Sequence, residues 1–209
     1  SEMCIRDSKR TEREKEEDDF WWEAFDHFCT YVKENTNCSV LREPTSEADD
    51  CIALWIQAHP NDKHVIISSD SDFYQLINNN VTLYNGVANQ VVTANGFYDE
   101  KDRPIIDKKT GETKLPPNPE WLLFEKCMRG DSADNVFSAY PKVRKNKLEE
   151  AFRDRANQGF VWNNLMLQRW TDHNGVEHRV KECYERNKKL IDLTQQPVSY
   201  THLTLPTSR

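Results

Sequence analysis

The stretch HVIISSDSDFYQL, residues 64–76, constrains the fold more than any other part of the sequence. Its apolar run, Val65–Ile67, is typical of a buried strand in a parallel sheet, and the FYQLI that follows predicts the start of a helix. Asp70 and Asp72 stand at this junction. Because open α/β sheets bind ligands beyond the carboxyl ends of their strands, we expect an α/β protein with a functional edge here.

Two neighbouring carboxylates need a physical explanation. At an effective dielectric constant of about 20, like charges ~4 Å apart repel by about 4 kcal/mol. The pair can turn outward into water, take up a proton, or hold a cation between them. A plain turn with solvated aspartates stays open as an alternative, because the D-x-D pattern alone is not specific.

Composition limits the class of protein. The 209 residues predict one domain, or one with a small appendage, and 37% hydrophobic with 30% charged residues suit a globular chain. No apolar run reaches membrane-spanning length, and we recognise no signal peptide. The six cysteines lack a CxxC spacing, which favours free thiols in a reducing compartment over zinc or disulfides. The net charge of −7 leaves nucleic-acid binding open, since a metal can neutralise acids while a local basic patch docks.

The two ends of the chain do not continue the patterns beside them. Residues 1–8 and 198–209 resemble translated sequencing-adapter read-through, so we interpret both as non-native tails and expect the natural protein to begin upstream. Between them we expect an α/β region over residues 9–129 and a helical region over residues 130–197.

The pattern of apolar residues predicts the elements of the first half. Aromatic residues recur at helical spacing between Phe20 and Val32, which predicts a helix packed into the core. The charged run at residues 9–19 predicts a solvated helix face or a disordered arm. Residues 38–43 predict a short strand, and Ser46 is expected to cap a helix that ends near His59.

Turn residues predict the elements of the second half. Two strands are expected on either side of Asn85-Gly86, followed by a polar loop over residues 99–119. A helix is expected from Glu120 to Arg129, ended by Gly130. The remainder, to about Leu193, is predicted to be helical.

Carboxylates gather in three clusters, each just past the end of a predicted element. The EADD acids, as we call the first cluster, are Glu47, Asp49 and Asp50; the others are Asp70 with Asp72, and Asp131 with Asp134. Helix capping is an alternative explanation for the first cluster, because acids are favoured at helix N-termini. A helix–turn–helix junction is an alternative for the third. If the strands are adjacent and parallel, the first two clusters share one rim and the third folds over it.

All-oxygen ligands without His or Cys fit Mg²⁺ or Mn²⁺ better than zinc. Two such ions about 4 Å apart would form a clamp for in-line displacement at phosphorus. The residues themselves thus predict a magnesium-type site for phosphoryl chemistry and no finer activity.

The order EADD, SSDSDFYQL, hairpin and GDSADNV resembles the 5′-nuclease superfamily, which includes flap endonucleases, the 5′-nuclease domain of bacterial DNA polymerase I and phage exonucleases. The resemblance is strongest to the ribonuclease H of T-even phages, which also has a late run like residues 187–193. It covers residues 9–196. It implies a PIN-like α/β core with a parallel sheet that lacks its N-terminal strand here, then a helix–three-turn–helix DNA-binding region.

The resemblance also implies activity and residue roles. It implies a Mg²⁺- or Mn²⁺-dependent 5′-3′ exonuclease or flap endonuclease with two ions per site, acting on 5′ ends, flaps and RNA–DNA hybrids. Asp49, Asp70 and Asp72 would be catalytic. All seven clustered acids would surround the metals: Glu47, Asp49, Asp50, Asp70, Asp72, Asp131 and Asp134.

The resemblance assigns nucleic-acid contacts to basic residues. We call the four near residue 145 the KVRKNK basic group: Lys142, Arg144, Lys145 and Lys147. They occupy the place of the helix–three-turn–helix that grips duplex backbone, although YPKVRKN replaces the family's Gly-rich hairpin. Lys9 and Arg10, with Arg13, resemble the tail of the family's arch. A solvated basic face is the alternative for both sets.

One departure from the family affects the active site. The family has two further aspartates, one ending its first strand and one before its arch, and nothing ahead of Glu47 matches them. We therefore expect an N-terminally truncated fragment with impaired cleavage. A non-cutting DNA-binding module of the same fold is the main alternative, and a different Mg²⁺ phosphoryl enzyme is a third.

The resemblance further implies a monomer in the cytoplasm of a phage-infected bacterium, with replication proteins as candidate partners and no membrane association.

Overall fold

The computed structural model describes residues 12–42, 46–132 and 134–195. The chain divides into two compact units, one with residues 1–45 and 199–209 and the other with residues 46–198. The expected boundary between residues 129 and 130 falls inside the second unit and stays a prediction. The predicted tails, 1–8 and 198–209, lie outside the described residues.

The first unit contains one long helix, α2 (Glu12–Asn35). The helix agrees with the predicted periodicity, but its aromatic face is not buried within the first unit. Phe20, Trp21 and Phe28 are each at least 60% exposed. Trp22 and Phe25 pack edge to face, and the guanidinium group of Arg42 lies over the ring of Phe25. The predicted strand at 38–43 is not formed over residues 38–42, and residue 43 lies outside the described residues.

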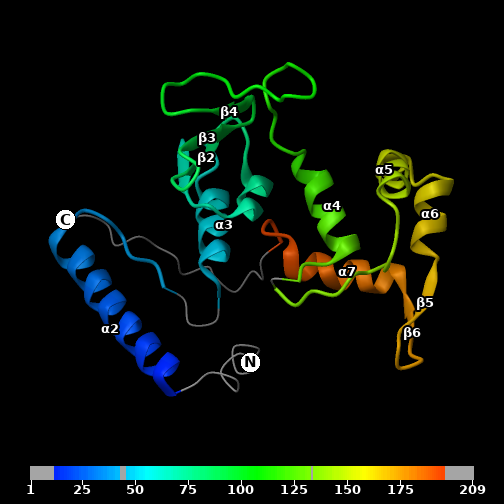
Figure 1. Ribbon diagram of the computed structural model, residues 1–209, viewed down its shortest axis with the longest axis horizontal. Helices are drawn as coiled ribbons and strands as arrows, with labels where there is room; N and C mark the ends of the chain where they lie inside the picture. The colour runs from blue at the N-terminus through cyan, green and yellow to red at the C-terminus, as the bar shows by residue number, and fades with distance from the viewer. Residues whose placement is uncertain (1–11, 43–45, 133, 196–209) are drawn as a thin grey trace. The chain divides into compact units, whose positions relative to one another are not determined.

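The second unit contains a four-stranded sheet in the order β1-β2-β3-β4, of which Figure 1 labels β2, β3 and β4. Its strands are β1 (His64–Ile67), β2 (Val81–Asn85), β3 (Gln90–Thr93) and β4 (Gly96–Tyr98). β1 and β2 are parallel, whereas β2, β3 and β4 pair antiparallel. The α/β class is confirmed, with a mixed sheet in place of a wholly parallel one. The hairpin around Asn85-Gly86 is confirmed too.

The burial predicted for β1 is only partly right. Ile66 is buried, but Val65 and Ile67 are 66% and 77% exposed. Among the described strands β1 pairs only with β2 and lies at the edge of the sheet. Successive side chains alternate between the two faces of a strand, so one face of β1 packs on the core and the other does not.

Two short helices flank β1 in the sequence and share a hydrophobic core with the sheet. They are α3 (Ala48–Ala58) and the 3-10 helix η1 (Ser71–Leu76). Glu47, not Ser46, is the N-cap of α3, and its backbone N–H donates to Asp50. Ala53 and Ile56 of α3 and Phe73 of η1 share one buried cluster with Ile66.

The predicted loop and the helix after it are confirmed. Residues 99–118 contain no strand beyond isolated bridges, and α4 spans Pro119–Arg129. Asn118 caps α4 by accepting a hydrogen bond from the backbone N–H of Trp121. Gly130 ends the helix as predicted, with φ of 78°, a value that favours glycine.

The last region is mostly helical but includes an unpredicted hairpin. Its helices are α5 (Lys145–Asp154), η2 (Arg155–Asn157), α6 (Phe160–Met166) and α7 (Val180–Ile191). The hairpin joins β5 (Arg169–Thr171) to β6 (Glu177–Arg179). Asp172 stabilises its turn by accepting backbone hydrogen bonds from Asn174 and Val176. The sequence DHNG at the turn is the signal that the helical prediction missed.

A second core holds the helical region together. Phe124 and Met128 of α4, Leu148 of α5 and Leu165 of α6 are buried in it, and Val180 of α7 joins them. The sheet cluster and this helical cluster are separate. The three acidic clusters belong to the same unit as both cores.

Two further predictions concern the chain's environment. No described helix has the length and apolar character needed to span a membrane. Among the described cysteines, Cys29, Cys38, Cys127 and Cys183 form no disulfide. This agrees with the thiols expected from the sequence.

Candidate metal centre

The turn after β1 places Asp70 and Asp72 where the sequence predicted them. Asp70 is the N-cap of η1, and its Oδ1 accepts a hydrogen bond of 2.8 Å from the backbone N–H of Asp72. The backbone N–H of Asp70 in turn donates to Ser68 Oγ at 3.1 Å. Asp70 therefore has a capping role of its own, while the side chain of Asp72 is directed elsewhere.

The loop after α4 carries Asp131 and Asp134. Asp131 and Val136 exchange backbone hydrogen bonds of 2.8 and 2.7 Å, which close the loop into a tight turn. A Cβ on Gly130 would lie only 2.3 Å from the carbonyl oxygen of Val136. Glycine is thus required at residue 130 because the end of α4 and the returning loop approach so closely.

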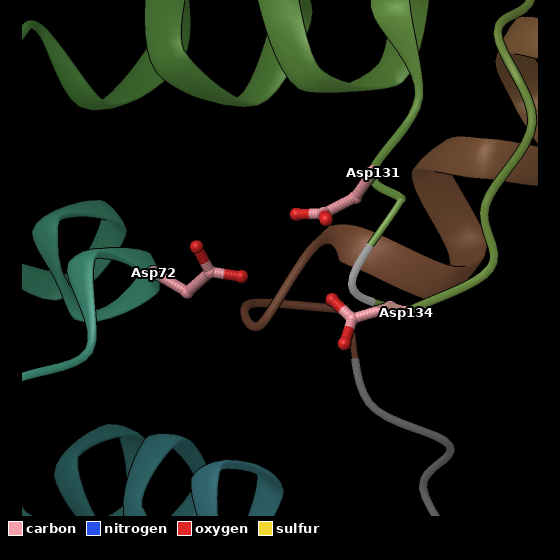
Figure 2. A group of neighbouring side chains, drawn as sticks. All are labelled: Asp72, Asp131 and Asp134. Atoms are coloured by element: carbon pink, nitrogen blue, oxygen red, sulfur yellow. The ribbon is translucent and has the colours of Figure 1, made fainter. Parts of the chain in front are cut away.

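Three carboxylates from these two segments come together, and we call Asp72, Asp131 and Asp134 the acidic triad. One oxygen from each lies within 4.8 Å of the others. Figure 2 shows the carboxylate of Asp72 turned toward those of Asp131 and Asp134. The proximity of the second and third predicted clusters is therefore a feature of the structure.

Lys126 of α4 lies between two members of the triad, and sequence reasoning missed it. Its Nζ donates to Asp131 Oδ2 at 2.9 Å and also to Asp72. Burial lowers the pKa of Lys126, but the hydrogen bonds to both carboxylates outweigh burial and raise it above its ordinary value. Lys126 is therefore a fixed positive charge within the acidic site. A lysine in the last turn of a helix is so common that nothing distinguishes this one in the sequence.

Asp134 is the exposed member of the triad. Its pKa is raised, first by burial and then by the negative charges of Asp131 and Asp72, which the charge of Lys126 only partly offsets. The local field at the triad thus remains negative with Lys126 in place.

The EADD acids lie beside the same field. Burial raises the pKa of Glu47, and the charges of Asp49, Asp50 and Asp134 raise it further. The pKa of Asp49 is raised by burial and, in smaller part, by the charges of Asp50 and Asp70, against its backbone hydrogen bonds. All three acidic clusters are therefore electrostatically coupled, although the EADD acids are not members of the triad.

The donor set fits a hard divalent cation. The triad offers carboxylate oxygens only, and its own charge raises the cost of ionising Asp134. Mg²⁺ and Mn²⁺ prefer such ligands, whereas zinc sites usually contain His or Cys. An ion bound here would offset a repulsion that the single ammonium group of Lys126 does not remove.

The KVRKNK basic group gathers where α5 begins. Its four side chains are exposed. Arg144 is the N-cap, and the first turn of α5 contains no acid. Lys142 adopts a φ of 62°, a left-handed conformation that residues other than glycine seldom take. Lys9 and Arg10 lie outside the described residues.

The sequence and the fold both match known nucleases. Residues 6–106 match the family described as 5′-3′ exonuclease, N-terminal resolvase-like domain. The fold is similar to that of a bacteriophage T5 protein co-crystallised with metal ions, with a TM-score of 0.61 and 19% identity. That similarity covers 92% of this chain and 67% of the T5 protein.

Two further structures of T5 nucleases are similar to the chain. One is the T5 flap endonuclease in a pseudo-enzyme–product complex with DNA and metal ions, at a TM-score of 0.61 and 19% identity, covering 92% of this chain and 66% of that one. The other is the T5 5′-exonuclease with zinc bound, at 0.62 and 20%, with the same coverage. The chain thus spans about two thirds of the length of these proteins. Residues 6–106 therefore match the 5′-3′ exonuclease family, and the chain shares the fold of these T5 nucleases.

Proposed function

We propose that the chain carries the metal-binding core and duplex-gripping helices of a metal-dependent 5′-3′ exonuclease or flap endonuclease. The observation that carries this proposal is the convergence of the acidic triad from two segments far apart in the sequence. The match of residues 6–106 to the 5′-3′ exonuclease family supports the nuclease class.

The proposed cofactor is Mg²⁺ or Mn²⁺, with two ions per site. The triad would hold one ion, and Asp70 with the EADD acids would contribute to the other, with Asp49 as the most direct ligand. Bound ions would activate a water and stabilise negative charge at the phosphate. The chain's own carboxylates fix where that charge is held, and Asp70 orients the start of η1 that presents Asp72.

The KVRKNK basic group is proposed to contact the phosphate backbone of duplex DNA. Cations are unfavourable near the positive end of a helix dipole, so helix stability does not explain three basic residues between Arg144 and Lys147. Phosphate binding does explain them, because the backbone N–H groups and side-chain cations then attract the same anion. Lys9 and Arg10 are proposed to contact the 5′ strand.

The finer assignments are likewise proposals. RNA–DNA hybrids, as for a T-even ribonuclease H, and branched DNA are the proposed substrates. The proposed setting is the cytoplasm of a phage-infected bacterium, where the protein acts as a monomer beside replication proteins. The whole protein is proposed to extend beyond this chain at its N-terminus, and the chain by itself to cleave poorly.

One observation favours a second candidate, a DNA-binding module that does not cut. Lys126 already forms ion pairs with both Asp72 and Asp131 without any metal. If divalent ions do not displace or complement this ammonium group, the site is inert and the KVRKNK basic group carries the function.

The substitution Asp70→Asn tests the two candidates. Asparagine also accepts the hydrogen bond that caps η1, so the fold should survive while a metal-binding charge is lost. With a 5′-labelled flap and an RNA–DNA hybrid in Mg²⁺ or Mn²⁺, we expect cleavage to fall by at least about 100-fold. Asp62→Asn, at an exposed position of the loop before β1, is the matched control and should cleave like the parent.

The assay is run on the chain and on the same chain extended upstream to its natural start. Equal cleavage by Asp70→Asn and Asp62→Asn would contradict the metal assignment. Duplex binding without cleavage by the extended protein would instead support the non-cutting candidate.

A further inference from the structure

Three amide side chains, two of them buried and one exposed, converge on the end of α7, and the proposed activity does not use them. They are Gln57 of α3, Gln75 of η1 and Asn187 of α7 itself. All three belong to, or contact, the run NKKLIDL at 187–193, which resembles a late segment of the family but has no role assigned from the sequence. Each of the three also lies on or contacts a segment that carries predicted metal-binding acids.

Asn187 forms hydrogen bonds to both ends of the loop that carries Asp131 and Asp134. Its side chain is fully buried, and its Nδ2 donates to the carbonyl oxygens of Cys127 at 2.8 Å and Phe137 at 2.7 Å. Cys127 lies in the last turns of α4, and Phe137 follows the loop that holds Asp131 and Asp134. Since Arg186 donates to Oδ1, the amide of Asn187 has partners on both of its polar atoms.

Gln75 ties η1 to the same run. It lies three residues after Asp72 and is only 9% exposed. Its Nε2 donates to the carbonyl oxygen of Ile191 at 3.2 Å, and its Oε1 accepts from the backbone N–H of Leu193 at 3.5 Å. The position of Asp72 relative to α7 is thus set by two hydrogen bonds in opposite directions.

Gln57 makes the third connection, from the helix of the EADD acids. Its Nε2 donates to the carbonyl oxygen of Leu193 at 3.3 Å. The shape of the run is itself fixed, because Asp192 is buried and accepts hydrogen bonds from the backbone N–H and hydroxyl of Thr194. Apolar side chains could fill the same space, but burying amides costs free energy unless they form directional bonds.

We propose that residues 187–193 form a brace that sets the spacing of the three acidic segments, with Gln57, Gln75 and Asn187 as positioning residues for the metal site. This inference rests on the proposed metal site. Mg²⁺ and similar ions require a narrow range of ligand distances, so a small displacement of η1 against the acidic loop weakens binding. Outer residues that orient metal ligands typically change affinity by about 10- to 100-fold.

The test measures Mn²⁺ binding by titration calorimetry and by the electron paramagnetic resonance signal of free Mn²⁺, with no nucleic acid present. Gln75→Met and Gln57→Met keep side-chain length but remove the hydrogen bonds. Asn187→Leu removes the third connection and leaves two carbonyl oxygens without their donor. Because Asn187→Leu can fail to fold, the two glutamine variants carry the test alone if it does.

The control for a merely structural effect is Val92→Ala, which removes buried volume from the core that Leu193 also joins but none of the hydrogen bonds of the brace. Urea unfolding in EDTA gives the loss of stability for each variant. We expect Gln75→Met to weaken Mn²⁺ binding by about 10- to 100-fold while Val92→Ala changes it by less than about 2-fold.

Equal affinities for Gln75→Met, Gln57→Met and Val92→Ala would overturn the brace and leave the metal site standing. A parent chain that binds no Mn²⁺ would overturn the proposed metal site and the brace together. The two failures are therefore distinguishable.

Discussion

Replacing Lys126 with methionine separates the metal-free site from the metal-bound one. The ammonium group of Lys126 bonds Asp72 and Asp131, and all three side chains are at most 20% exposed. Lys126→Met keeps the length of the side chain and removes the charge. The carboxylates of the acidic triad then face one another without an internal cation.

The expected loss of stability follows from these two contacts. A hydrogen bond to a charged group contributes about 1.5–3 kcal/mol, so the pair sets an upper limit of about 3–6 kcal/mol. Partial exposure to water reduces this to about 2–4 kcal/mol in the metal-free protein. For a unit of this size, the midpoint of thermal unfolding should fall by about 4–16 °C.

Divalent ions should reverse the effect. At about 100 times its dissociation constant, a ligand stabilises the folded state by about 2.7 kcal/mol. In Lys126→Met the ion meets no competing ammonium group, so we expect tighter Mn²⁺ binding and a larger stabilisation than in the parent. Differential scanning fluorimetry in EDTA and in Mn²⁺, with titration calorimetry, measures both quantities.

Lys181→Met is the matched control, since Lys181 is 67% exposed and pairs with Glu185 at 3.8 Å on the surface of α7. It should change stability by less than about 1 kcal/mol with or without metal. Equal destabilisation of Lys126→Met in EDTA and in Mn²⁺, or a fall in its Mn²⁺ affinity, would refute this account of Lys126.

Three other perturbations test separate parts of the site. Gly130→Ala should cost about 2 kcal/mol or more in urea unfolding, because its Cβ meets the Val136 carbonyl oxygen; Gly111→Ala, at φ of 73° with nothing within 4 Å, isolates the backbone cost alone. The raised pKa values of Glu47, Asp49 and Asp134 mean that these groups hold protons more tightly in the folded protein. In EDTA, their contribution to the free energy of unfolding should therefore fall as the pH rises from about 4 through the raised pKa values, and Mg²⁺ should make this fall smaller. The contribution is measured against the variant with all three groups replaced by their amides, and a contribution that rises with pH would contradict the coupling. Neutralising the KVRKNK basic group should weaken duplex binding and reduce the slope of log K against log salt by about 0.9 for each phosphate that is no longer neutralised, whereas an unchanged slope would return the group to a solvated face.

The sequence predicts most elements of the second unit because their signals are local. The Val65–Ile67 run, the Asn85-Gly86 turn and Gly130 each depend on nearby residues, and each is found at the expected place. Predictions that depend on distant partners fail more often. Residues 38–42 have strand-forming composition but form no strand, because they pair with no described strand. Val65 is exposed because the face of β1 that carries it does not pack on the core.

In the candidate site, too, residues marked by a local pattern are predicted and residues that depend on distant partners are missed. The acids of the triad stand out in sequence because each follows the end of an element. Lys126 and Gln75 do not stand out in the sequence. Lys126 resembles any lysine in the last turn of a helix, and Gln75 resembles any surface glutamine. Their importance arises only when α4 and the end of α7 are brought against η1, and no local pattern encodes that meeting.

Departures from local preference gather around the proposed nucleic-acid and metal surfaces. Lys142 adopts a left-handed conformation, basic residues occupy the N-terminus of α5, and Asp134 is held in a field that opposes its ionisation. Each departure costs folding free energy, and contacts within the chain offset the second and third only in part. Lys145 lies 4.0 Å from Glu125, and the charge of Lys126 partly offsets the field at Asp134. Anionic phosphate would compensate the first two, and a divalent cation the third. A nuclease needs both partners at once, so a single substrate–metal complex would relieve all three costs.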